Sequence, residues 1–579
     1  MPSAIPSALS RQVMTFAEVK PAPGRWKFAL HATAITAVAV ALISLILGPA
    51  LALVGLLGAF LGVVASNRPI RNRLVILSAM DATYIVGTAL GTLVGESPVL
   101  LTMLLCTIAV ITVLGYNTLV GEPPGAMFLI IGPAIATYLP SVGMARGSII
   151  AVAAIGCIGA SAASLLLQLL TPRQAEQDAM DGARQAVTEY LDTDVETTPL
   201  SRRAALRDNA YANVFAASMI LEDAVGREPR LHRWRQMNSE LRRLHVAIVE
   251  RIVRIHLLGS TVAVSGMEQR RYLGRPDATY LVRWGLSTAS LPWLAARRIG
   301  AAVLLTCVVS YGFHIGHPYW SVMTAALIMS MQADRLSLTH RALHRLAGTV
   351  VGIGVFAAVH SLHLSGIIVV LITLVLVFFI QLLAVRNYAI AVIFVTPMAL
   401  LISTASSPYK PIGTIVGQRF LETLIGAAAS LLVIWIMGRR TPIALVRRQF
   451  RRTLRSLERL LLLLSDGQQS TDSGYAARRD LAFEKLQCGR ILQIAQSDLP
   501  GELADGDELE TALNELTYVV LAACWTTDPV TALDAHAMAQ RLQRLLAHLP
   551  PVGTTPVDAT GIADALRVLL RVGKRLNIE

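Results

Sequence analysis

The chain has 579 residues, of which 54% are hydrophobic and only 15% are charged, and its mean hydropathy is +0.56. This composition excludes a set of ordinary soluble domains, a disordered chain and a secreted disulfide scaffold, and it indicates a protein that lies mostly in a membrane. We assign the net charge of +13 to cytoplasmic loops and not to nucleic-acid binding, because no zinc, RNP or helix-turn-helix pattern accompanies it.

Six apolar runs follow a polar N-terminal tail, residues 1–25. They lie at 28–48, 50–66, 74–94, 98–115, 125–139 and 147–170. Their lengths approach the roughly 20 residues that cross a bilayer as a helix, so we expect residues 26–170 to form a first membrane region. The first run has no A-x-A site, so we expect a retained anchor and no cleaved signal.

A polar segment, residues 171–298, separates this region from six more apolar runs. These lie at 299–314, 319–332, 342–361, 364–384, 388–404 and 413–437, and a polar tail follows at 438–579. Both polar segments have apolar residues at helical spacing, in 241–258 and in 445–464. We therefore expect an all-α polytopic membrane protein with about twelve spans, in which each membrane region, the second being 299–437, is followed by a helical cytoplasmic domain.

Basic residues fix the expected orientation. Arg25, Arg68, Arg73, Arg335 and Arg439 all fall in turns on one side of the predicted spans. Turns on the opposite side carry little positive charge, with Arg146 and Lys410 as the exceptions. The positive-inside rule then places both termini in the cytoplasm.

The two membrane regions resemble each other. Gly87-Thr88-Ala89-Leu90-Gly91 in the third run corresponds to Gly348-Thr349-Val350-Val351-Gly352 in the ninth, and Pro133 corresponds to Pro397. Because each half has an even number of spans, both halves enter with the same orientation. We therefore expect two parallel six-helix repeats with a pathway at their interface.

A shorter motif occurs twice in the second region. It reads Arg345-x-x-x-Thr349-x-x-Gly352 and then Arg419-x-x-x-Thr423-x-x-Gly426. At this spacing the three side chains share one helix face. For the glycines and threonines, helix packing is an alternative to substrate contact; the packing candidates are Gly87, Gly91, Gly348, Gly352 and Gly426. An arginine at membrane depth costs at least about 3 kcal/mol unless it faces water or a partner, and Glu422 is the obvious partner of Arg419.

The second region closely resembles the fusaric acid resistance (FUSC) family of bacterial inner-membrane proteins. The motifs that carry the resemblance are His317-Pro318-Tyr319-Trp320-Ser321, Arg341-Ala342-Leu343-His344-Arg345 with its continuation to Gly352, Arg386-Asn387-Tyr388-Ala389, and Arg419 to Gly426. That family includes exporters of aromatic carboxylic acids and is similar to plant aluminium-activated malate transporters. The resemblance implies a bacterial inner-membrane location and an organic-anion substrate, and exporters of this type can work with a periplasmic adaptor protein.

The resemblance and the charges together give a set of candidate pathway residues. We expect Arg341 and Arg345 to attract the anion at the cytoplasmic mouth and Arg419 to bind it deeper through its planar fork. The remaining candidates are Thr349 and Thr423 as hydrogen-bond donors, Tyr319 and Trp320 as stacking rings or interfacial belt residues, and Arg386 and Asn387 as pathway residues or positive-inside anchors.

Asp81 is a single acid within the third apolar run. It could couple transport to protons, since a buried carboxylate binds protons more readily, or it could pair with an arginine of the other half.

The sequence predicts no enzyme, no cofactor and no metal site. No two of the five cysteines have CxxC spacing, and the phosphate-binding pattern Gly-x-x-x-x-Gly-Lys-Ser/Thr is absent. We therefore expect an inner-membrane efflux permease for small organic anions, aromatic carboxylates above all, driven by the electrochemical gradient and not by ATP. The alternatives are a gated organic-anion channel and a membrane scaffold that transports nothing.

Overall fold

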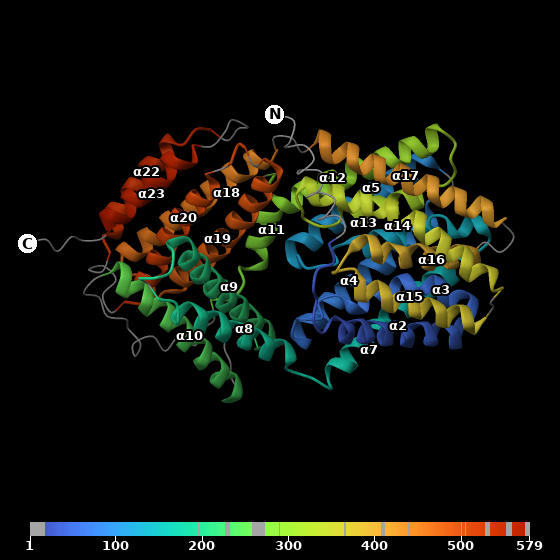
Figure 1. The fold of residues 1–579 in the computed structure, drawn as a ribbon, viewed down its shortest axis with the longest axis horizontal. Coiled ribbons are helices and arrows are strands. Elements are labelled where there is room, and N and C mark those ends of the chain that lie inside the picture. Colours follow the sequence, from blue (N-terminus) through green and yellow to red (C-terminus); the bar gives the residue numbers. More distant parts are fainter. Residues whose placement is uncertain are drawn as a thin grey trace, which may run out of the picture. The chain divides into compact units, whose positions relative to one another are not determined.

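The protein is all-helical, as its sequence predicts. The structure, a computed structural model shown in Figure 1, describes residues 18–95, 97–194, 196–225, 232–257, 273–288, 290–363, 366–406, 411–437, 441–499, 501–503, 505–526, 533–551 and 558–573. Within these ranges every secondary-structure element longer than one residue is a helix. Lys410 and Arg439, which contributed to the expected orientation, lie outside the described residues.

The chain divides into two compact units. The apolar unit comprises Met1–Ser66, Arg73–Leu170 and Trp284–Arg439, and the polar unit comprises Asn67–Asn72, Thr171–Arg283 and Arg440–Glu579. The two polar segments, which the sequence places about 150 residues apart, thus pack into a single unit instead of forming two separate domains.

The apolar unit contains the helices that correspond to the apolar runs. Those of its first half are α2 (Arg25–Leu47), α3 (Pro49–Ala59), η1 (Phe60–Val63), α4 (Ile70–Leu93), α5 (Pro98–Leu119), α6 (Met127–Ala136), η2 (Leu139–Val142) and α7 (Arg146–Gln168). Those of its second half are α12 (Leu291–Gly312), α13 (Tyr319–Met329), α14 (Arg335–Ser361), α15 (Ile367–Leu383), α16 (Tyr388–Ser406) and α17 (Ile412–Ile436). Seven helices of the described chain, α2, α4, α5, α7, α12, α14 and α17, are long and apolar enough to cross a membrane.

Helix α12 begins well before the apolar run that predicted it. The hydroxyl of Ser290 accepts a hydrogen bond from the backbone N–H of Trp293, so this serine is an N-cap. The side chains of Leu294 and Ala296 are buried. A capping serine, with a proline at the second helical position, therefore starts the helix at Leu291, although Arg297 and Arg298 interrupt the hydropathy signal.

Helix contacts within the apolar unit follow the same pattern in both halves. Helix α3 packs against α7 as α13 packs against α17. Across the halves, α5 packs against α12 as α15 packs against α2, and α6 packs against α13 as α16 packs against α3. In each half a pair of glycines permits one close crossing: a Cβ on Gly87 would lie 2.7 Å from Cγ of Pro133 in α6, and one on Gly348 would lie 2.6 Å from the carbonyl oxygen of Ala389 in α16.

The polar unit is a bundle of amphipathic helices. They are α8 (Gln174–Leu191), α9 (Leu200–Val225), α10 (His232–His256), α18 (Thr441–Ser465), α19 (Asp472–Asp498), α20 (Gly506–Ala523), α22 (Ala535–His548) and α23 (Ala559–Gly573), and α11 (Ala278–Leu286) leads from it to α12. Helix α18 shows why they fold: Leu454, Leu457, Leu461 and Leu464 recur at helical spacing and are fully buried. This stripe joins a core shared with α9, α10, α19 and α20.

Candidate functional site

Arg419 in α17 is held by an acid and by two aromatic rings. Its Nη1 lies 2.7 Å from Oε2 of Glu422, and its Nη2 donates to the hydroxyl of Tyr319. The guanidinium carbon lies 4.6 Å from the ring centroid of Tyr319 and 4.8 Å from that of Trp320. The arginine is only 8% exposed, so these contacts satisfy a charge that would otherwise be costly inside an apolar bundle.

A second layer of contacts fixes the two rings. The indole Nε1 of Trp320 donates to the hydroxyl of Thr423 at 3.0 Å, and that hydroxyl donates to the carbonyl oxygen of Arg419. The ring of Tyr138, which follows α6, stacks on Tyr319 with centroids 4.6 Å apart, and the His317 ring lies 5.7 Å from both. Residues from both halves of the apolar unit therefore meet at this arginine.

Arg345 in α14 is more deeply buried and less satisfied. It is 1% exposed, and its Nε and Nη1 have no hydrogen-bond acceptor in the described part of the chain. Tyr388, at the start of α16, is within electrostatic range, and its hydroxyl likewise lacks a partner among the described residues. The hydroxyl of Thr349 donates to the backbone of its own helix, at the carbonyl oxygen of Arg345.

Arg341 lies one helical turn before Arg345 and contacts the same tyrosine. Its guanidinium carbon lies 4.6 Å from the Tyr388 ring centroid, and its Nη2 donates to the carbonyl oxygen of Leu327 in α13 at 3.0 Å. Tyr388 thus lies beside Arg341 and within electrostatic range of Arg345, and the three residues form a second cationic cluster.

Arg386 and Asn387 make different contacts. Nη2 of Arg386 donates to the carbonyl oxygen of Ala22, and Nδ2 of Asn387 donates to that of Glu18. The side-chain oxygen of Asn387 accepts the N–H of Ala389 at 2.9 Å, which caps the first turn of α16. These contacts fasten the N-terminal segment and start a helix, which is a structural role and not a pathway role.

Asp81 in α4 is 7% exposed and faces Ser161 and Cys157 of α7. Its Oδ1 has no partner and the carboxylate makes no ion pair among the described residues. An arginine from the other half, one of its two expected roles, is therefore not found beside it in the described chain.

Several residues of these clusters escaped the sequence analysis. Tyr138 gave no signal, because an aromatic residue at a helix end is common in membrane proteins, and Tyr388 belonged to a recognised motif but had no assigned role. His317 was part of a quoted motif but had no assigned role. Arg73 was interpreted as a loop residue, yet it is 2% exposed and donates to the carbonyl oxygens of Gly62 and Val64.

These features define a polytopic α-helical membrane protein with arginines buried in its apolar unit. Residues 304–433 match the family described as fusaric acid resistance protein-like, and this range contains both arginine clusters. Over this segment the chain is similar to the fusaric acid resistance family of membrane proteins, in agreement with the resemblance seen in its motifs.

One curated relative supports the same placement. The chain is similar to "Uncharacterized membrane protein YvaC" of Bacillus subtilis (strain 168), at 27% identity over 165 residues, which is 28% of this chain and 26% of the relative. The match thus spans about a quarter of the relative's length. No solved structure matches the chain.

Proposed function

We propose that the protein is an inner-membrane efflux permease for small organic anions, with aromatic carboxylates as the preferred class, and that it is a transporter and not an enzyme. The observation that carries this proposal is the 1% exposed guanidinium of Arg345 within an apolar helix, whose Nε and Nη1 have no acceptor among the described residues. A buried cation without an acceptor is costly, and an entering carboxylate would supply the missing acceptor.

The neighbours of Arg345 favour the same ligand. Arg341 adds a second positive charge one turn away, and the hydroxyl of Tyr388, which has no partner among the described residues, adds a donor. Arg–carboxylate pairs form short charge-assisted hydrogen bonds, which select an anion over a neutral molecule. We assign Arg341, Arg345 and Tyr388 as the entry site.

Arg419 is proposed as the deeper site. Because Glu422 already neutralises it, an anion can bind there only if that acid is displaced or takes up a proton from water. Tyr319 and Trp320 would then present their rings to an aromatic substrate. Thr349 and Thr423 each donate their hydroxyl proton to their own helix, so the proposal rests on the arginines and not on the threonines.

We further propose that the twelve apolar helices form two parallel six-helix repeats with about twelve spans and with both termini and the polar unit in the cytoplasm. The matching contacts of the two halves support this arrangement. The shorter helices α3, α6, α13, α15 and α16 would then cross only part of the bilayer or cross it at reduced length.

The drive for export is proposed to be electrochemical. An anion that leaves an inside-negative cell gains about 2.3 kcal/mol per charge per 100 mV, which concentrates it outside well over tenfold. No phosphate-binding loop is present in the sequence to couple transport to ATP. A periplasmic adaptor would extend this route to the exterior.

The test is flux of radiolabelled 4-hydroxybenzoate in proteoliposomes under an imposed membrane potential. We expect saturable, potential-dependent flux that Arg345→Gln abolishes and that Arg297→Gln, a change at an exposed arginine of α12, leaves intact. Flux by Arg345→Gln equal to wild type at equal protein level would remove the entry site.

Two other outcomes would contradict the proposal that the protein is a carrier. Large unitary currents without counterflow would favour the gated anion channel. Liposomes that move neither 4-hydroxybenzoate nor an aliphatic dicarboxylate such as malate would favour the scaffold.

A further inference from the structure

Asp81 occupies the middle of α4, where a charge is most costly. It is the twelfth of the 24 residues from Ile70 to Leu93, so about 17 Å of helix lies on either side of it. Helix α4 is long and apolar enough to cross a membrane, and Asp81 is the one acid in its sequence. A carboxylate at this depth needs a partner or a proton to remove the cost of its charge.

The surroundings of Asp81 leave that charge unbalanced. The residue is 7% exposed, its Oδ1 has no hydrogen-bond partner, and it forms no ion pair within the described chain. Ser161 and Cys157 approach the carboxyl group from α7. The hydroxyl of Ser161 also has no partner among the described residues, and the thiol of Cys157 donates to the carbonyl oxygen of Ala154. Neither side chain is a cation, so α7 does not neutralise the acid.

The other titratable groups near Asp81 on α4 are engaged elsewhere. Arg73, two turns earlier, donates to two backbone carbonyl oxygens at the end of η1 and to Gln168 and Ser164 of α7. Tyr84, three residues after Asp81, packs its ring against glycines of α3 and α6. The smallest ligand that removes the charge of Asp81 is therefore a proton.

A proton suits this position better than a metal ion. A metal cation of the hard class needs several oxygen ligands, whereas the neighbours of Asp81 on α7 supply one hydroxyl and one thiol. The described residues contain no group of three or more His, Cys, Asp or Glu side chains that could hold a metal ion. Protonation needs no further ligand, and a protonated carboxyl group can donate to the hydroxyl of Ser161.

The second half of the apolar unit carries the opposite charge at a nearly equivalent position. Asp81 lies six residues before Gly87 of α4. Arg345 lies three residues before Gly348, the glycine of α14 that corresponds to Gly87. Within the described chain the acid lacks a cation, and the arginine lacks an acceptor for Nε and Nη1. A proton on Asp81 and a carboxylate on Arg345 would together balance both buried charges.

We propose that Asp81 is a proton-binding residue and that its proton couples anion export to pH. The carboxylate takes the proton from water and returns it to water, so only an O–H bond forms and breaks. The coupling rests on the proposed function, because it requires transport. Proton binding by Asp81 does not, and it can be measured in protein that moves no substrate.

The first measurement follows the protonation of Asp81 itself. Infrared difference spectra of the full-length protein in lipid are recorded between acidic and alkaline pH. We expect a band from a protonated carboxyl group that Asp81→Asn removes and that Asp178→Asn, a change at an exposed acid of α8, leaves in place. Carboxyl bands that are the same in wild type and in Asp81→Asn would overturn the proposal.

The second measurement follows protons during transport. Proteoliposomes contain a trapped pH-sensitive dye, 4-hydroxybenzoate is the probe, and liposomes without protein give the background. We expect 4-hydroxybenzoate to cause proton movement above that background in wild type. Asp81→Asn should lose this movement together with the dependence of anion flux on a pH gradient, and Asp81→Glu, which keeps a carboxyl group, should retain both.

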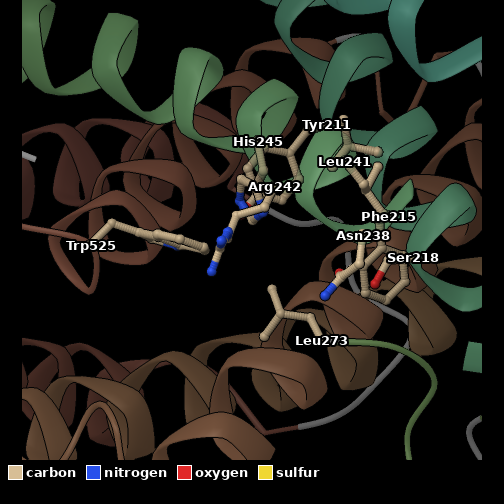
Figure 2. Close-up of a pocket in the computed structure, with 10 residues that line it drawn as sticks. Tyr211, Phe215, Ser218, Asn238, Leu241, Arg242, His245, Leu273 and Trp525 are labelled. Atoms are coloured by element: carbon tan, nitrogen blue, oxygen red, sulfur yellow. The ribbon is translucent and has the colours of Figure 1, made fainter. Parts of the chain in front are cut away.

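His245 provides a control for pH effects that arise in the polar unit. It lines a cavity there together with Tyr211 and Trp525, and Figure 2 shows these side chains. Burial, together with the charge of Arg478, lowers the pKa of His245 to about 3, so the imidazole stays neutral near neutral pH. His245→Gln should therefore keep the wild-type dependence of flux on the pH gradient.

The outcomes separate this inference from the proposed function. Proton-coupled flux that survives in Asp81→Asn at the wild-type level would overturn the role of Asp81 and leave the permease intact. A wild type that shows the Asp81 band but moves no 4-hydroxybenzoate would contradict the permease and the coupling, and it would support the proton site. If Asp81→Asn does not fold, Asp81→Glu takes its place in the spectra, where an unshifted carboxyl band would overturn the assignment.

Discussion

Nη1 of Arg419 lies 2.7 Å from Oε2 of Glu422, three residues further along the same buried helix. Both residues are less than a tenth exposed, so neither charge has ready access to water. The short separation in sequence holds the pair together in every conformation in which α17 stays helical. An anion that reaches Arg419 must therefore compete with Glu422, which the helix keeps next to the arginine.

The buried ion pair should show strong coupling on substitution. Glu422→Gln leaves Arg419 without its counter-charge, and Arg419→Met leaves the acid alone; each should destabilise the protein by about 3–5 kcal/mol. The double variant removes both charges and should recover most of that loss. Thermal unfolding midpoints of the four proteins in detergent measure this cycle, and additive effects would contradict the coupling.

Thr423 has a testable structural role as the acceptor of the Trp320 indole. Thr423→Val preserves shape but leaves the buried Nε1–H without its acceptor, at a cost of about 1–3 kcal/mol. Thr423→Ser keeps the hydroxyl and should stay close to wild type. The unfolding midpoints of the two variants should therefore differ, and equal midpoints would show that the bond adds little.

Two glycines of α14 provide a matched pair for helix packing. A Cβ on Gly352 would lie 2.6 Å from Cβ of Thr396 and 2.9 Å from the carbonyl oxygen of Ile393, whereas one on Gly354 would meet nothing within 4 Å. Gly352→Ala should therefore destabilise the protein by about 1–3 kcal/mol through overpacking. Gly354→Ala should be neutral or mildly stabilising. Comparable losses of folded protein on heating would refute the close crossing of α14 and α16.

His245 predicts a pH dependence of stability in the polar unit. Its pKa falls from 6.5 to about 3 on folding, mainly through burial. Between these two values the unfolded chain binds a proton that the folded protein does not, so the free energy of unfolding decreases as the pH falls through that window. His245→Gln should therefore lose less stability than wild type between pH 7 and pH 4.

The control for that measurement is His536→Gln, at an exposed residue of α22. It should follow the wild-type pH dependence of the unfolding midpoint. If His245→Gln and His536→Gln both track wild type, His245 is protonated in the folded protein as readily as in the unfolded chain.

The positions of the helices could be predicted from sequence because burial in lipid or protein requires apolar residues and each run is bounded by Gly, Pro or charge. The start of α12 could not be predicted in this way, since Arg297 and Arg298 interrupt the hydropathy signal. The helix nevertheless begins before them, where Ser290 caps it. Hydropathy also cannot distinguish a helix that faces lipid from one that other helices enclose. Helices α3 and α13 are enclosed, because most of their side chains are buried.

Only part of the candidate site could be predicted from the sequence, for a related reason. The spacing of Arg419 and Glu422 within one helix made their pairing predictable. Contacts between helices carry no such local signal, so the stacking of Tyr138 on Tyr319 and the position of Tyr388 beside Arg341 emerged only from the fold. The joining of two distant polar segments into one unit is likewise a long-range event that no local pattern encodes.

Helix α13 has 11 residues, and nearly all of its side chains are buried. At 1.5 Å per residue it reaches about 16 Å, roughly half of the hydrocarbon thickness of a bilayer. The amide hydrogens of its first turn have no carbonyl to bond within the helix, and that turn begins at Tyr319, the residue that Arg419 contacts. The positive end of a helix dipole therefore lies at the residue whose ring contacts the guanidinium, so this end of α13 would attract negative charge even if the arginine were replaced.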